Sequence, residues 1–149
     1  MPKIRVTKEF NFEMAHALWD YDGACKNIHG HSYRLFVTII GEPIDDKNSP
    51  KNGMVMDFGD LKRLVKAAII DKFDHAVVFS SAAPTKNLFF TPQMFEKYEI
   101  LPFQPTCELL VNEFAARIKP LLPPEVKLYS VRLYETATSY AEWFSEDNE

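Results

Sequence analysis

Two segments of this chain alternate apolar and polar side chains with a period of two, and this alternation constrains the fold more than any other feature. The segments cover residues 4–16 and 31–40. Side chains of a strand point alternately to its two faces, so each segment is predicted to be a strand with one buried face. The apolar positions of one parity are Ile4, Val6, Phe10, Phe12 and Met14 in the first segment, interrupted by Lys8, and Tyr33, Leu35, Val37 and Ile39 in the second.

Two helices and two further strands are predicted after these segments. The chain contains a loop over 42–53, a helix from the N-cap Asp57 to about Phe73, a second helix from Pro105-Thr106 to the residue before Pro120, and strands over 126–135 and 138–144. Apolar residues at helical spacing support both helices, and aspartate is a preferred N-cap. The order of elements indicates an α+β fold with a four-stranded antiparallel sheet. Such a sheet leaves two edges to cover, and oligomerisation is one way to cover them.

The segment from residue 81 to residue 103 contains three prolines and has no regular pattern. Long segments of this kind are usually functional or mobile, so we expect an inserted loop near a subunit contact or the mouth of the site. The whole chain, residues 1–149, has a length that fits one domain with a core of its own.

Charge and hydropathy argue against several classes of function. The formal net charge is −4 and no basic stripe is available to neutralise phosphates, which argues against a nucleic-acid partner. No run approaches the roughly 18 apolar residues of a membrane span, and the N-terminus lacks the apolar core of a signal peptide. Cys25 and Cys107 make a poor disulfide framework, and reduced thiols in the cytoplasm are the simplest interpretation.

Three of the four histidines cluster at positions 16, 29 and 31. A spacing of two places His29 and His31 on one face of a strand. If the first two strands pair antiparallel, the end of the first, at His16, lies beside the start of the second, at His31. Three imidazoles would then supply neutral nitrogen ligands and leave a fourth position open, as in catalytic zinc sites. Spacing alone leaves two alternatives open: incidental histidines, or a closed structural site with Cys25 as the fourth ligand.

The run from Cys25 to Tyr33 resembles the Cys-x-x-x-His-Gly-His pattern of the 6-pyruvoyltetrahydropterin synthase and 6-carboxytetrahydropterin synthase family. Other segments resemble the family in the same order along the chain. They are Phe12–His16, Gly53–Phe58, Phe73-Asp74-His75 (with Phe in place of the family's Leu), Pro105–Glu108 and Tyr134–Thr136. The resemblance covers nearly the whole chain apart from the irregular segment.

The resemblance implies a tunnelling fold, in which a four-stranded antiparallel sheet carries two helices on one face. It also implies that the sheets of several subunits form a barrel, commonly as trimers paired into hexamers, with active sites at subunit interfaces. It further implies zinc held by His16, His29 and His31, and dihydroneopterin triphosphate as the substrate. A Lewis acid at the substrate hydroxyls would stabilise the enolate that forms when a neighbouring carbon loses its proton.

The resemblance also assigns roles in proton transfer and substrate binding. Cys25 is expected to be the general base that removes protons beside the metal. Asp74 and His75 resemble the family's acid–base pair; adjacent residues on an extended segment point in opposite directions, so these two side chains need not touch. Glu135 is expected to anchor the pterin and to take part in proton transfer, since a carboxylate accepts two parallel hydrogen bonds from the ring N–H and the exocyclic amine.

Thr106 and Glu108 match a second substrate-binding motif, although both are also ordinary residues at a helix start. Binding of the triphosphate would need lysines or arginines at the mouth of the site. The candidates, which the spacing does not distinguish, are Lys26, Arg34 and Lys86.

The leading hypothesis is a zinc-dependent lyase that converts dihydroneopterin triphosphate to 6-carboxytetrahydropterin and releases triphosphate and acetaldehyde, as in the queuosine-pathway branch of the family. The compact Cys-x-x-x-His-Gly-His spacing and the modest length favour that branch. The pyruvoyl-forming synthase of the tetrahydrobiopterin pathway is the alternative. A pterin-binding zinc protein without turnover is disfavoured because the whole proton-transfer set is present, and a zinc hydrolase because no His-Glu-x-x-His motif is present.

Overall fold

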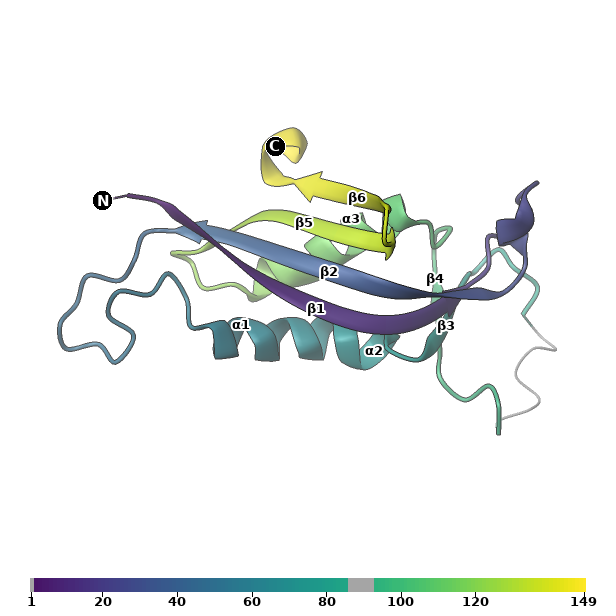
Figure 1. Cartoon of the computed structure of the whole chain (residues 1–149), viewed down its shortest axis with the longest axis horizontal. Helices are drawn as coiled ribbons and strands as arrows, with labels where there is room; N and C mark the ends of the chain where they lie inside the picture. Colours follow the sequence, from purple (N-terminus) through teal and green to yellow (C-terminus); the bar gives the residue numbers. More distant parts are fainter. Residues whose placement is uncertain (1, 86–92) are drawn as a thin grey trace.

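The computed structural model describes residues 2–85 and 93–149, and its main feature is one curled sheet (Figure 1). Within these residues the sheet has six strands in the spatial order β4-β3-β1-β2-β5-β6. The strands are β1 (Ile4–His16), β2 (His29–Gly41), β3 (Ala76–Ser80), β4 (Tyr98–Leu101), β5 (Lys127–Thr136) and β6 (Ser139–Phe144). The long β1–β2 pair forms the middle of the sheet.

Four of the strands form the antiparallel sheet that the sequence predicts. β1 pairs with β2 along its full length, from Ile4 opposite Gly41 to His16 opposite His29. β2 pairs with β5, and β5 with β6, both antiparallel. The buried side chains of β1 and β2 all have the predicted parity, so one face of this pair is apolar and the other faces outward.

β3 and β4 extend the sheet beyond β1, and the sequence pattern does not predict them. β3 is parallel to β1 and pairs with it only at Met14–His16, while β4 is parallel to β3. β4 lies inside the segment 81–103, so the expectation of an irregular loop is wrong for its four residues. Both strands are too short to show a period, and β3 is a run of five residues that is mostly apolar.

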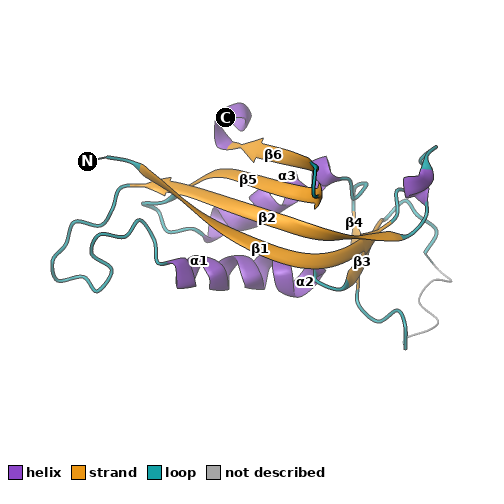
Figure 2. Ribbon diagram, viewed as in Figure 1, coloured by secondary structure: helices purple, strands orange, loops and turns teal. Residues whose placement is uncertain are grey.

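Both predicted helices form and lie on the same face of the sheet (Figure 2). The first is continuous through α1 (Phe58–Val65), the π-helical η2 (Lys66–Ile70) and α2 (Asp71–Phe73), and the second is α3 (Cys107–Ile118). Asp57 caps the first helix, as predicted, by accepting hydrogen bonds from the N–H groups of Gly59 and Asp60. Short 3₁₀ turns are η1 (Ala24–Lys26), η3 (Lys119–Leu121) and η4 (Ser145–Asn148). None of the described helices is both long and apolar enough to cross a membrane.

The core fills the space between the apolar face of the sheet and the two helices. The rings of Phe12 and Tyr33 stack with their centroids 5.1 Å apart, and Phe114 of α3 meets Phe12 edge-on at 6.1 Å. All three side chains are at most 2% exposed. Tyr33 differs from its neighbours because its buried hydroxyl has no hydrogen-bond partner among the described residues. A buried hydroxyl without a partner has a desolvation cost that no hydrogen bond offsets, so this position is not optimised for stability alone.

β1 and β6 each have an edge without a partner strand in the described part of the chain. The second edge of β1 is used only at Met14–His16, which leaves residues 4–13 paired on the β2 side alone. β6 is the outermost strand on the other side of the sheet. Ile4 and Tyr140, on these two strands, are 44% and 49% exposed. Such edges are surfaces that the strands of another chain can extend.

We expect Tyr33→Phe to leave the free energy of unfolding unchanged or to raise it by up to about 1 kcal/mol, because it removes a buried hydroxyl without a partner and keeps the stacked ring. Urea denaturation followed by tryptophan fluorescence measures this change. As a control, Tyr33→Leu also removes the ring stacked on Phe12 and should lower the free energy of unfolding by about 1–3 kcal/mol. A loss above about 1 kcal/mol in Tyr33→Phe would mean that the hydroxyl has a partner in solution.

Candidate metal centre

The three clustered histidines lie where β1 ends and β2 begins. His16 is the last residue of β1 and stands directly opposite His29, the first residue of β2. His31 stands opposite Met14, so the register differs by two residues from the predicted pairing of His16 with His31. All three still share the core-facing side, because opposed residues of an antiparallel pair, and residues two apart on a strand, point the same way.

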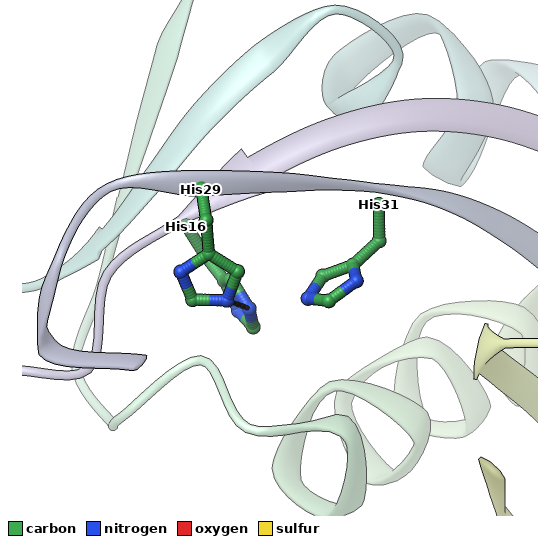
Figure 3. Close-up of side chains that lie close together, drawn as sticks. All are labelled: His16, His29 and His31. Atoms are coloured by element: carbon green, nitrogen blue, oxygen red, sulfur yellow. Dashed lines mark hydrogen bonds between the residues drawn. The ribbon is translucent and has the colours of Figure 1, made fainter. Parts of the chain in front are cut away.

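The side chains of these histidines converge on one point (Figure 3). One ring nitrogen from each of His16, His29 and His31 lies within 4.8 Å of the others, and the Nε2 atoms of His16 and His29 are 3.0 Å apart. Among the residues that the structure describes, this is the one group of three or more candidate ligands that could hold a metal ion. The fold therefore brings together the residues that the sequence pattern selects.

The backbone fixes the tautomer of two of these imidazoles. Nδ1 of His16 lies 2.7 Å from the carbonyl oxygen of Pro105, and Nδ1 of His29 lies 2.6 Å from that of Asn27. A carbonyl oxygen only accepts hydrogen bonds, so Nδ1 is the donor and Nε2 of a neutral ring keeps its lone pair. Two lone pairs 3.0 Å apart repel each other, and a cation bound between them removes that repulsion. Histidines that bind metals are typically held by a carbonyl or carboxylate in this way.

Burial keeps the imidazoles of His16 and His31 neutral. The side chain of His16 is almost fully buried; burial, opposed by the hydrogen bond to Pro105, lowers its pKa from 6.5 to about 4. Burial also lowers the pKa of His31, although the charge of Glu135 acts in the opposite direction. Nε2 of His31 is buried and lacks a hydrogen-bond partner in the described part of the chain. Neutral imidazoles and an orphaned ring nitrogen fit a divalent metal ion.

The carboxylate of Glu135 lies beside the cluster. Its Oε1 atom is 3.5 Å from Nε2 of His16 and 3.7 Å from Nε2 of His31. Glu135 follows the buried Leu133 on the core-facing side of β5, at an irregularity in the pairing of β5 with β6. Its side chain is 26% exposed, so it borders both the cluster and solvent. A carboxylate in this position can accept hydrogen bonds from a ligand next to the metal.

Cys25 lies in η1, within the loop that joins β1 to β2. The loop turns back on itself, because the N–H of Leu18 donates to the carbonyl oxygen of Cys25 at 2.9 Å. Cys25 is partly exposed and does not belong to the group of ligand atoms that lie within 4.8 Å of one another. The geometry therefore favours an open site of three histidines over the closed site with Cys25 as a fourth ligand.

Asp74 and His75 lie where the chain leaves α2 and enters β3. Their side chains touch, contrary to the expectation for an extended segment: Nδ1 of His75 is 3.0 Å from Oδ1 of Asp74. The cause is the backbone of His75, whose φ of 63° lies in the left-handed region. Glu13 of β1 supports this conformation, since its N–H donates to Oδ1 of Asp74 at 2.9 Å and its carbonyl oxygen accepts from the N–H of His75.

Asp74 and His75 do not join the histidine cluster within one chain. His75 is 76% exposed and lines a shallow hollow of about 320 Å³ together with Glu13 and Ser32, with His31 also at its wall. The side chains of Glu13 and Ser32 point to the face of the sheet opposite that of the His31 side chain. Burial acts to raise the pKa of Asp74, but hydrogen bonds from the N–H of Glu13 and from His75 hold it below its usual value.

The remaining predicted residues cap a helix or lie away from the cluster. Thr106 is the N-cap of α3, where its hydroxyl accepts from the N–H three residues on at 3.2 Å, and Glu108 is exposed in the first turn. Arg34 points to the face opposite the histidines and pairs with a glutamate of β1 at 2.9 Å. Lys26 is exposed in η1, and Lys86 lies outside the described residues.

Three groups that shape this site leave no mark in the sequence pattern. They are the carbonyl oxygens of Asn27 and Pro105, which orient the histidine rings, and the ring of Tyr33, whose centroid lies 5.6 Å from that of His31. Every residue has a carbonyl group, so a main-chain acceptor has no residue type that could identify it. Tyr33 fits the apolar parity of β2, and only its place two residues after His31 could have indicated a position near the site.

The chain belongs to the 6-pyruvoyl tetrahydropterin synthase family, which matches residues 5–146. It is 37% identical over 142 residues to the 6-carboxy-5,6,7,8-tetrahydropterin synthase of Haemophilus influenzae, covering 94% of this chain and 98% of that protein. The protein of the same name from Aquifex aeolicus is 32% identical, with 97% and 99% covered. The 6-pyruvoyl tetrahydropterin synthase of Caenorhabditis elegans has a TM-score of 0.70 at 24% identity, with 97% of each chain covered. These matches confirm the expected family and the tunnelling fold.

We expect His29→Ala to weaken binding of Zn²⁺, used as the probe, by more than about 100-fold, because losing a ligand should cost more than the 10–100-fold typical of losing a group that orients one. Competition with a chromophoric chelator measures the affinity. His75→Ala is the matched control, since it removes the one histidine outside the cluster and should retain the affinity of the unmodified protein. Equal affinities in both variants would contradict a metal centre at His16, His29 and His31.

Proposed function

We propose that this chain is a zinc-dependent lyase of queuosine biosynthesis that converts dihydroneopterin triphosphate to 6-carboxytetrahydropterin, with release of triphosphate and acetaldehyde. The observation that carries this proposal is the convergence of three imidazoles beside the carboxylate of Glu135. Membership of the family, and the two relatives named 6-carboxy-5,6,7,8-tetrahydropterin synthase, support the choice of substrate and product.

In this proposal His16, His29 and His31 hold the zinc ion. When bound, zinc supplies a Lewis acid that polarises the side-chain hydroxyls of the substrate and so acidifies the neighbouring C–H bond. The carbonyl oxygens of Pro105 and Asn27 hold two of the rings in the orientation and tautomer that a metal requires. Burial keeps His16 unprotonated at neutral pH, so protons do not compete with the metal for that ring.

Glu135 anchors the pterin ring and Cys25 is the base. A carboxylate can accept two parallel hydrogen bonds, from the ring N–H and the exocyclic amine, and Glu135 lies within 3.7 Å of two imidazoles, so the bound ring would lie beside the metal. Cys25 belongs to the loop that begins directly after one metal ligand, His16, and ends before the next, His29. Thr106 and Glu108 at the start of α3 contribute further contacts to the ring.

We also propose that the active form is a homo-oligomer built from trimers that pair into a hexamer. The support for this is the separation of Asp74 and His75 from the histidine cluster within one chain, together with the unpaired edges of β1 and β6. Strand pairing between copies would close the sheets into a barrel. A second copy would then bring its acid–base pair to the metal centre of the first.

The alternative within the family is the pyruvoyl-forming synthase of the tetrahydrobiopterin pathway. The family model carries the name of this alternative, and the enzyme of that name from Caenorhabditis elegans has the same fold. Both reactions begin from the same substrate and need the same metal and proton-transfer groups. The identity of the product therefore distinguishes them, and a pterin-binding protein without turnover would give no product at all.

We expect the zinc-loaded protein to form 6-carboxytetrahydropterin and acetaldehyde from dihydroneopterin triphosphate, as detected by mass spectrometry. Cys25→Ala should lower the rate by at least about 100-fold, because general acid–base catalysis typically contributes 10²–10⁴-fold. Cys107→Ala is the matched control: its thiol is buried and donates to the carbonyl oxygen of Leu133, so its loss should leave the rate within about threefold.

Formation of 6-pyruvoyltetrahydropterin instead would place the protein in the tetrahydrobiopterin branch with the same site. Absence of either product, with zinc and pterin bound, would rule out turnover of this substrate and favour the binding role.

We expect two inactive variants, His29→Ala and His75→Ala, to regain activity when their chains are dissociated and reassembled together. If the metal centre of one copy uses the acid–base pair of another, random mixing restores up to about a quarter of the sites. The measurement is the specific activity of the mixture against each variant treated alone. Recovery should be absent when His29→Ala is mixed with His16→Ala, since both lack a metal ligand. No recovery in the first mixture would contradict a site shared between copies.

A further inference from the structure

We propose that Gln104 is a positioning residue, whose side-chain amide holds the loop that carries Cys25. The inference rests on the proposed function, because it is the role of Cys25 as the base that makes the position of this loop matter. Gln104 lies in the segment that leads from β4 into α3, 85 residues away in sequence from the backbone that it binds.

Gln104 makes a two-point contact with the backbone of Trp19. Its Oε1 atom accepts from the N–H of Trp19, and its Nε2 atom donates to the carbonyl oxygen of the same residue, both at 2.9 Å. A primary amide carries a donor NH₂ group and an acceptor oxygen side by side, so it can satisfy both main-chain groups of one residue at once. Such a bidentate contact fixes the orientation of the bound residue as well as its distance.

The constraint continues from Trp19 to Cys25 through the backbone. Leu18, the residue before Trp19, donates its N–H to the carbonyl oxygen of Cys25 at 2.9 Å. A second local bond joins the N–H of Tyr21 to the carbonyl oxygen of Leu18 at 3.3 Å. In the described part of the chain, the two bonds from Gln104 are those that tie residues 17–28 to an element distant in sequence.

The loop has too few buried side chains for packing alone to fix its position. The side chains of Trp19 and Tyr21 are 47% and 46% exposed, and the turn η1 has no buried residue. Loops with few buried contacts open locally at low free-energy cost, so hydrogen bonds to a rigid element decide their order.

Gln104 is in turn fixed to the part of the molecule that orients a metal ligand. Its carbonyl oxygen accepts from the N–H of Thr106 at 2.8 Å, and Thr106 caps the buried helix α3. The residue between them, Pro105, accepts from Nδ1 of His16 at 2.7 Å. Residues 104–106 therefore set the position of the loop and the orientation of His16 from one rigid point. This places the backbone that carries the thiol of Cys25 in a fixed relation to the metal centre.

The test compares Gln104→Ala and Gln104→Glu with Gln93→Ala, which changes the chain's one other glutamine, an exposed residue. Glutamate has the shape of glutamine but presents a second oxygen to the Trp19 carbonyl, so it tests the hydrogen bond rather than the packing. Hydrogen exchange should become at least about tenfold faster at the Leu18 amide in both Gln104 variants, and remain unchanged in Gln93→Ala.

Alkylation by iodoacetamide gives a second readout that does not depend on turnover. Cys107 is buried and burial raises the pKa of its thiol to about 12, so the folded protein reacts through Cys25. We expect the rate at Cys25 to rise at least about threefold in both Gln104 variants, because the loop opens more often. With substrate, kcat should fall at least about tenfold while KM stays within about threefold, since a misplaced base affects the chemical step.

Unchanged exchange and alkylation in both variants would overturn the proposal. So would faster exchange spread over β1, β2 and β5, which would show that Gln104 supports the whole fold rather than the loop. If the unmodified protein turns over no pterin triphosphate, the proposed function fails, while exchange and alkylation still decide whether Gln104 holds the loop. If the loop loosens while kcat stays normal, Gln104 holds the loop but does not position the base, and the positioning role is overturned.

Discussion

The register of β1 against β2 is the constraint on which the rest of the site depends. It places His16 opposite His29, and the two-residue period of a strand then adds His31 to the same side. A slip of one residue would turn every side chain of one strand to its other face. Burial of the apolar side chains and convergence of the histidines therefore require the same register. Burial of the core residues thus supplies free energy that holds the three imidazoles together.

Most of this architecture follows from sequence periodicity, and the exceptions have physical causes. The four antiparallel strands and both helices are long enough to show a period, and the Asp57 cap follows from residue type. β3 and β4 have five and four residues, too few to show a period, and the pairing of β3 with β1 depends on contacts distant in sequence.

Some features of the candidate site were likewise predictable from the sequence and others were not. The histidines are predictable because strand parity links sequence to direction, and the family resemblance indicated Glu135 as a pterin anchor, without its place beside them. The contact between Asp74 and His75 was not predictable, since it depends on a left-handed backbone that a non-glycine residue rarely adopts. The orienting carbonyl groups and the amide of Gln104 act on backbone atoms, so no spacing of residue types identifies them.

The Nε2 atoms of His16 and His29 lie 3.0 Å apart with both lone pairs directed inward, and this makes the stability of the fold depend on bound cations. In the unfolded chain the same rings are separated and hydrated, so a cation that relieves the repulsion binds the folded state and stabilises it by mass action. The abundance of intact protein would then rise and fall with the concentration of free metal. Scarcity of the metal would then shorten the time for which the chain survives proteolysis.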